Sequence, residues 1–402
     1  MNRKFLVTFL YVYALAFSFV KTVRLPNQWS EAHWLMDYRF GFIKRGLAGE
    51  IFGFFFEKNV LNIQILSAVV LLLLYAAILT ISLRTTFENY SIRKVLFYLV
   101  FFLSQYVVLS AHLIGYLDHV IFLLTILAVY LIRNKKIFLA SLLAVFSVVI
   151  HEISFFLMVP VCLFALLIYE MPGKSIVFSK NLFKKVGIFL FFPLAATVLI
   201  SVYQEIWGKE NDQLIFHYLE GTGFISKKVA LMISSAYTES FGTYLRQQSV
   251  YFVDRLFLSK NTLKFGLPIL FMMYLVYREF KKINRYVLSL LVAVSLFPLL
   301  LHAVAWDEFR IWAFPFMILF LGFWVISNRY KADEISDARL SWFEIVLFII
   351  SIILVAIFQN NLFENEIERL SKIQRCMLLV PMGVLTGYLY LKKSPNKQIL
   401  RP

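Results

Sequence analysis

The sequence predicts an all-α, polytopic integral membrane protein with about twelve transmembrane helices. Hydrophobic residues make up 60% of the 402-residue chain, and its mean hydropathy is +0.76. Apolar stretches of about 16–22 residues recur along the chain, and each is long enough to cross ~30 Å of hydrocarbon as a helix. Lys and Arg concentrate in the segments between alternate stretches, as they do in cytoplasmic loops. These observations predict one membrane domain over residues 1–402.

The order of the apolar stretches gives the predicted spans. They lie at residues 5–22, 60–83, 95–114, 119–132, two within 137–169, 186–203, 263–277, 286–303, 311–327, 341–358 and 376–391. The first span follows two cations and lacks a small-residue cleavage site, so we interpret it as an uncleaved signal-anchor. Residues 137–169 would form one helix of ~50 Å, which exceeds a single crossing. We therefore expect a bend at His151-Glu152.

Two long outer segments are predicted at about residues 23–58 and 204–262. Within the first, residues 46–56 are apolar, too short to cross and flanked by charges, which is typical of a helix lying in the interface plane. The second combines mixed charge with many aromatic residues. We expect it to form amphipathic helices on the outer leaflet.

Charge bias sets the predicted orientation. More than half of the 40 Lys and Arg residues fall in the predicted cytoplasmic segments, and most of the 24 acidic residues fall outside them. The positive-inside rule then places both termini on the cytoplasmic side of the membrane. It also accounts for the net charge of +16, so nucleic acid is not an expected partner. Cys162 and Cys376 lie within spans and are expected to be buried packing residues.

This topology places every histidine and nearly every clustered acid of the chain on the outer side of the membrane. The set comprises Asp37, Asp118, His119, His151, Glu152, His302 and Asp307. Ionisable groups at membrane depth are costly. Their shared side therefore predicts an active site that faces away from the cytoplasm.

The first outer segment carries two carboxylates followed by three cations. These are Glu31, Asp37, Arg39, Lys44 and Arg45. Transfer of a sugar from a lipid-linked phosphate needs a base for the acceptor hydroxyl and cations for the donor phosphates. The planar fork of Arg binds phosphate oxygens in pairs. We expect catalytic carboxylates and donor-binding cations here; the alternative is an interfacial loop whose cations meet anionic lipid head groups.

Two predicted outer turns carry further polar pairs, Asp118-His119 and His151-Glu152. We expect His151 and Glu152 to be catalytic candidates, with Asp118 and His119 contacting substrate. The alternative is that these polar residues only form the turns and take no part in substrate binding or catalysis.

A third polar group precedes the span at 311–327. Asp307 and Arg310 are spaced i,i+3, so they share a helix face and can pair. Asp307 is a catalytic candidate and Arg310 a phosphate contact, unless the two form only a structural ion pair. Trp306 would either stack on a sugar ring or belong to the interfacial aromatic belt.

Several familiar signatures are missing from the sequence. It contains no phosphate-binding glycine loop, no GxGxxG and no HExxH. A nucleotide sugar or ATP is therefore not the expected donor, and a lipid-linked donor fits better. No cofactor is expected, and no residue spacing demands a divalent metal.

An acidic first outer loop followed by a short interfacial helix resembles the GT-C superfamily of membrane glycosyltransferases. The Trp29-Ser30-Glu31-Ala32-His33 run is similar to the Asp-Glu-Ala stretch of many members, with Ser30 in place of the first acid. The resemblance implies a catalytic acid at Glu31 or Asp37 and a polyprenyl-linked sugar donor. The span count and the large outer segment also resemble O-antigen and capsule polymerases of the Wzy type.

The expected function is thus a glycosyltransferase or polymerase in surface-polysaccharide assembly at the periplasmic face. Its partners would be a polyprenyl (pyro)phosphate-linked donor, a glycan acceptor, the bilayer and a chain-length regulator. Two alternatives come from other classes. One is a flippase or transporter of lipid-linked oligosaccharide, and the other is a membrane acyltransferase with His151 or His302 as its base.

Overall fold

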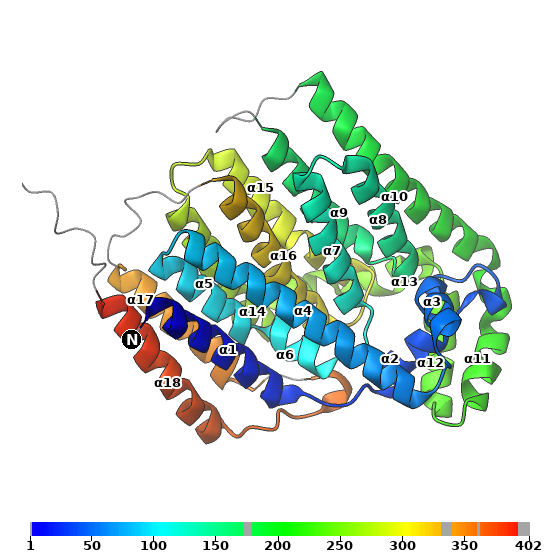
Figure 1. Cartoon of the computed structure of the whole chain (residues 1–402). Coiled ribbons are helices and arrows are strands. Elements are labelled where there is room, and N and C mark those ends of the chain that lie inside the picture. The colour runs from blue at the N-terminus through cyan, green and yellow to red at the C-terminus, as the bar shows by residue number, and fades with distance from the viewer. Residues whose placement is uncertain (1, 172–178, 331–339, 360–361, 393–402) are drawn as a thin grey trace, which may run out of the picture.

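The computed structural model describes residues 2–171, 179–330, 340–359 and 362–392 as a bundle of helices (Figure 1). Helix accounts for 83% of the chain, and no strand occurs among the described residues. The all-α prediction is therefore confirmed. Helices long and apolar enough to cross a membrane are present, which is compatible with a membrane protein.

The first half of the chain contains the following elements. They are α1 (Arg3–Thr22), α2 (Gln28–Leu35), η1 (Tyr38–Phe40), α3 (Gly46–Phe55), α4 (Val60–Glu88), α5 (Ile92–Leu103), α6 (Gln105–His112), α7 (Asp118–Arg133), α8 (Ile137–Ile150), α9 (Ser154–Glu170) and α10 (Lys180–Trp207). The predicted helix at 46–56 is thus present as α3.

The second half begins with the large segment predicted to be amphipathic, which is helical. It contains η2 (Gly208–Asn211), α11 (Asp212–Gly221), α12 (Lys227–Thr238), α13 (Phe241–Gln248), η3 (Ser249–Tyr251) and η4 (Asp254–Leu258). The remaining elements are α14 (Lys260–Glu279), α15 (Arg285–Leu296), η5 (Phe297–Ala303), α16 (Glu308–Arg329), α17 (Trp342–Ile352), η7 (Ile353–Ile357), η8 (Phe363–Asn365) and α18 (Lys372–Leu391).

Six helical segments in the described part of the chain have the length and apolar composition of a membrane span. They are α1, α4, the α5–α6 segment, the segment from α10 to α11, the α15–η5 segment and α16. The other predicted spans are also helical but shorter or less apolar. The figure of about twelve crossings therefore stays a prediction.

The centre of the bundle is formed by α5, α6 and α16. These helices are apolar all round and buried on nearly every side, as expected of a helix surrounded by others. Aromatic rings join them: Phe97 lies tilted against Phe323 at 4.2 Å, and Phe101 stacks on Phe320 at 4.4 Å between ring centroids. By contrast, α10 and α18 expose most of their apolar side chains at the edge of the bundle.

Two helix breaks shape the bundle. The predicted bend at His151-Glu152 is confirmed, because α8 ends at Ile150 and His151 takes an extended backbone. The predicted span at 95–114 is present as one apolar helical segment, but Ser104 has an extended backbone and divides it into α5 and α6, a break that was not predicted. No charge or proline marks this break in the sequence.

Cys376 corrects another expectation. Cys162 is buried in α9, as predicted, but Cys376 is exposed. The reason is that α18 lies at the periphery, where Met377 and Val380 are also exposed. The apolar sequence of α18 therefore indicates an apolar outer surface rather than a core.

Ion pairs join residues that the sequence places on the same side of the membrane. At the C-terminal end of α1, Lys21 and Arg375 both contact Glu368, at 3.2 and 2.5 Å. Near the other end of α1, Arg93 binds Glu344 at 2.6 Å, and this pair is buried too. Each charge is compensated within the apolar bundle, as a buried charge must be.

A close contact fixes α3 against the chain that precedes it. A Cβ atom added to Gly49 would lie 2.0 Å from the carbonyl oxygen of Met36 and 2.8 Å from that of Trp34. Only glycine allows this approach, because both neighbours are backbone atoms that cannot rotate away. The contact positions the whole turn that leads into α3.

We expect Gly49→Ala to lower the free energy of unfolding by about 1–3 kcal/mol, because the added methyl group overpacks this contact. Gly187→Ala in α10 is the matched control, since nothing lies within 4 Å of its added Cβ. The control should leave stability unchanged or raise it slightly. Thermal unfolding of the purified protein measures both, and equal behaviour of the two variants would contradict the packing described here.

Candidate active site

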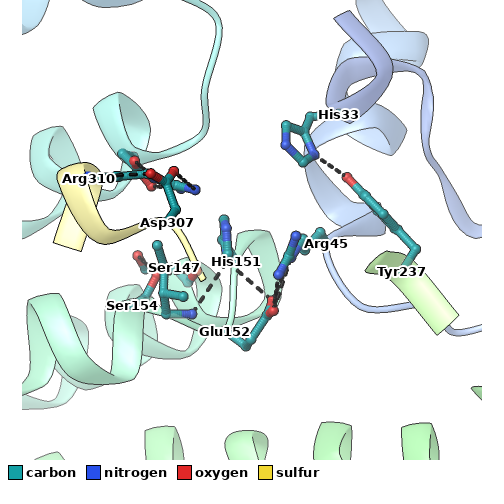
Figure 2. A network of polar contacts seen from close by, with 11 residues as sticks. His33, Arg45, Ser147, His151, Glu152, Ser154, Tyr237, Asp307 and Arg310 are labelled. Carbon is teal, nitrogen blue, oxygen red and sulfur yellow. Dashed lines mark hydrogen bonds and ion pairs between the residues drawn. The ribbon is translucent and has the colours of Figure 1, made fainter. Parts of the chain in front are cut away.

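Polar side chains from distant parts of the chain meet at one end of the bundle (Figure 2). We call this set the polar cluster. It consists of His33, Arg45, Asp118, His151, Glu152, Tyr237, Asp307 and Arg310. In Figure 2, Arg310 and Asp307 lie on one side, His33 and Tyr237 on the other, and His151 between them.

Arg310 in the first turn of α16 is held by two carboxylates. Its Nε and Nη2 donate to Asp118 at 2.6 Å each, a side-on pairing of two parallel hydrogen bonds. The Asp307 carboxylate lies 4.0 Å from Nη1 and accepts a hydrogen bond from the backbone N–H of Arg310. The predicted pairing of Asp307 with Arg310 is therefore present. The stronger partner, Asp118 at the start of α7, was expected only to contact substrate.

Arg45 forms a second side-on pair, with Glu152 in the connection between α8 and α9. Its Nε donates to both carboxylate oxygens at 2.9–3.0 Å, and its Nη2 also contacts Glu152. Arg45 has a left-handed backbone (φ 64°) immediately before α3. A non-glycine residue in this conformation is uncommon, and such residues often occur at functional sites.

The two histidines of the polar cluster are neutral at pH 7. Burial lowers the pKa of His151 to about 4, and the nearby charge of Arg45 acts in the same direction. Its Nδ1 lies 3.2 Å from Glu152. Burial and then Arg45 also hold the pKa of His33 well below its usual range, and its Nδ1 is hydrogen-bonded to the Tyr237 hydroxyl at 2.8 Å. Neutral imidazoles can accept or donate a proton.

The acids of the polar cluster differ in their environments. Burial raises the pKa of Asp307 to about 6, and Arg310 only partly offsets this effect. Burial alone would also raise the pKa of Glu152, but Arg45 and His151 hold it well below its usual range. Asp307 is thus the carboxyl group whose proton equilibrium lies near neutral pH, which suits an acid or base.

Asp37 lies in a different environment from the one expected. Nε of Arg39 donates to its two carboxylate oxygens at 2.8 and 3.0 Å, and Nζ of Lys58 also binds it. Burial would raise its pKa, but hydrogen bonds from Arg39 and Lys58 lower it instead. The interactions of Asp37 within the described ranges do not join it to the polar cluster. Its predicted catalytic role, and the phosphate-binding role of Arg39, stay predictions.

The other predicted residues are dispersed around the polar cluster. Glu31 is buried and hydrogen-bonded to Gln64, and burial raises its pKa. Lys44 donates to the carbonyl of Glu239 at 2.6 Å, and burial lowers its pKa to about 8.

Three further predicted residues lie at the edges of the site. His119 is buried beside Asp118, and Trp306 is 50% exposed. His302 is buried in η5, and neither ring nitrogen has a hydrogen-bond partner among the described residues.

Sequence reasoning missed His33, Tyr116, Tyr237 and Lys58 as site residues. His33 stands in the run around Glu31, so its proximity to acids was a usable signal. Tyr237 lies more than 200 positions later, and its contact with His33 depends on how α12 folds back on α2. No group of three or more His, Cys, Asp or Glu side chains is arranged to hold a metal ion in the part of the chain that the structure describes.

Comparisons with known protein families, with curated proteins and with solved structures find no match to this chain.

Glu152→Gln is expected to lower the free energy of unfolding by about 1–3 kcal/mol, because it leaves the Arg45 guanidinium without its opposing charge. Arg84→Gln is the matched control, since Arg84 pairs with Glu88 on an exposed helix face. Exposed pairs contribute little, so we expect no measurable change there. Denaturant unfolding compares the two, and an unchanged Glu152→Gln protein would show that the pair does not stabilise the site.

Proposed function

We propose that the protein is a membrane glycosyltransferase. It would transfer a glycan from a polyprenyl (pyro)phosphate carrier to a sugar hydroxyl, at the periplasmic face of a bacterial inner membrane during surface-polysaccharide assembly. The polar cluster carries this proposal, because it places two arginines and a carboxyl group with a pKa of about 6 around neutral histidines. The apolar helices around it suit a lipid-linked substrate.

The arginines fit the phosphate groups of the donor. Arg45 and Arg310 each use Nε and Nη2 to bind a carboxylate. Nη1 of Arg310 lies 4.0 Å from the Asp307 carboxylate, beyond hydrogen-bond distance, so it can still donate to a phosphate oxygen, and Arg45 offers the corresponding group. Because the carboxylates already orient both guanidinium groups, little reorganisation is needed when negative charge develops on the leaving phosphate.

Asp307 fits the role of general base. In this step Asp307 takes the proton of the acceptor hydroxyl, while the hydroxyl oxygen bonds to the anomeric carbon. The bond from that carbon to the donor phosphate breaks, and Arg45 and Arg310 stabilise the phosphate that leaves. Asp37 is less suited to this role because two cations already hold its charge. Asp37 instead links η1 to the residues before α4.

A membrane acyltransferase is the second candidate. His151 Nδ1 lies 3.2 Å from Glu152, an arrangement in which a carboxylate orients a histidine base. The mass of the product distinguishes the two candidates, since glycosyl transfer lengthens the glycan and acyl transfer adds an acyl group.

The test uses purified protein in lipid nanodiscs with a mass-tagged, polyprenyl-linked oligosaccharide, and follows products by mass spectrometry. Asp307→Asn should lower the rate about 10²–10⁴-fold, the usual contribution of a positioned base. Asp254→Asn, at an exposed site, is the control and should keep the rate of the wild type. If Asp37→Asn instead abolishes transfer while Asp307→Asn keeps it, the base assignment is wrong. Absence of any longer glycan from the wild type would refute the transferase.

The rate of transfer should depend on pH through Asp307. Its protonated form cannot accept a proton, so kcat/KM is expected to rise with pH and level off above about 6, where the carboxylate predominates. Asp307→Asn should lose this rise and keep only a low, flat rate. A wild-type profile without an inflection between pH 5 and 7, under conditions where the protein stays folded, would remove Asp307 from the role.

A further inference from the structure

Phe363 lies within a group of aromatic rings beside the polar cluster. Its ring centroid is 5.8 Å from that of Trp29, 6.2 Å from that of Tyr116 and 5.9 Å from that of Trp306. Trp29 belongs to α2, whereas Tyr116 and Trp306 precede α7 and α16. We call Trp29, Tyr116 and Trp306 the aromatic cage.

Tyr116 connects the aromatic cage to the polar cluster. Its ring meets the edge of His33 at 5.6 Å between centroids, and the Arg310 guanidinium lies 5.2 Å from it. Its hydroxyl is buried and has no hydrogen-bond partner among the described residues. A buried hydroxyl without a partner is costly. A ligand with a hydroxyl group would satisfy it.

The segment that carries Phe363 is held by a hydrogen bond from Nε2 of the buried His112 to the backbone carbonyl of Phe363 at 3.2 Å, and by ion pairs near the surface. Arg24 donates to Glu364 at 2.9 Å and to Glu366 at 2.5 Å, and these two acids are 36% and 48% exposed. Exposed ion pairs contribute little to stability. Glu364 also has a left-handed backbone (φ 64°), which is unfavourable for a residue with a side chain. These polar contacts involve the backbone and the neighbouring side chains, so the ring of Phe363 can leave the cage by a change of rotamer while its backbone stays in place.

We propose that the aromatic cage binds a pyranose ring of the acceptor glycan, and that Phe363 occupies this site when substrate is absent. The inference rests on the proposed glycosyl transfer and assigns its acceptor subsite. The apolar face of a pyranose packs on indole and phenol rings much as Phe363 does, and a sugar hydroxyl would bond to the Tyr116 hydroxyl. Asp307 lies next to Trp306 in the chain, so a sugar here is adjacent to the proposed base.

The partial exposure of these rings distinguishes a binding site from a packing core. Trp306 is 50% exposed, and Trp29 and Phe363 are only partly buried. Phe97 and Phe101 in the centre of the bundle are buried, whereas a ligand can reach the rings of this group from outside. A site at the surface is also accessible to a second, glycan-bearing substrate.

The test measures binding of methyl glucopyranoside, methyl galactopyranoside and methyl mannopyranoside to the full chain. Lipid nanodiscs free of sugar-headed detergent hold the protein, and saturation-transfer difference NMR with Trp fluorescence reports on the aromatic cage. Phe363→Ala should lower the Kd of at least one pyranoside about tenfold, because the competing occupant is removed. Trp306→Ala should abolish that binding. Phe257→Ala, which removes an exposed ring from η4, is the matched control and should match the wild type.

Glu366→Gln provides a second test that leaves every aromatic ring in place. It removes one of the two acids that bind Arg24, so we expect the same direction of change as for Phe363→Ala but about twofold in size. The inference is overturned if both variants leave the Kd unchanged or raise it, or if Trp306→Ala leaves binding intact. These binding measurements need no turnover. Failure of the transfer assay would therefore not be confused with failure of the cage.

Discussion

A guanidinium group cannot leave water without an opposing charge, and at Arg45 and Arg310 this requirement joins four separate parts of the chain. Arg45 precedes α3 and pairs with Glu152 between α8 and α9. Arg310 lies in the first turn of α16 and pairs with Asp118 at the start of α7. Each pair fixes a helix end that apolar packing alone would leave free to slide. The candidate site therefore exists because these charges must be neutralised at the end of an apolar bundle.

The same constraint acts elsewhere in the bundle with a different outcome. Arg93 and Glu344 are both buried, and their side-on pair fixes α5 against α17. Both residues are almost wholly buried, away from the candidate site, so the pair is best explained as structural. At the polar cluster, by contrast, the arginines lie beside neutral histidines and a carboxyl group with a pKa of about 6. That difference separates a site able to bind an anion from a structural crosslink.

Environment, and not residue type, assigns different chemistry to the carboxyl groups. Asp37 and Asp307 are both aspartates near arginines, yet the pKa of Asp37 is lowered whereas that of Asp307 is raised to about 6. The cause is competition between burial and hydrogen bonding. Lys58 and Arg39 both bind Asp37, while Arg310 gives its strongest bonds to Asp118 and leaves Asp307 under-compensated. An acid whose pKa lies near neutral pH can exchange a proton readily. An acid whose charge is held by two cations does so less readily.

Local pattern was enough to predict the helical class, the helix at 46–56 and the break at His151-Glu152, because hydropathy and chain length set helix lengths. Of the ionisable residues expected to share one site, only some meet in the polar cluster, and Asp37 does not. The sequence also placed Asp307 near Arg310, since i,i+3 spacing is a property of one helix. It did not reveal that Asp118 is the main partner of Arg310, or that Tyr237 reaches His33. Those contacts join residues about 200 positions apart. Only the packing of the helices decides which buried charge meets which, and that packing depends on the whole core at once.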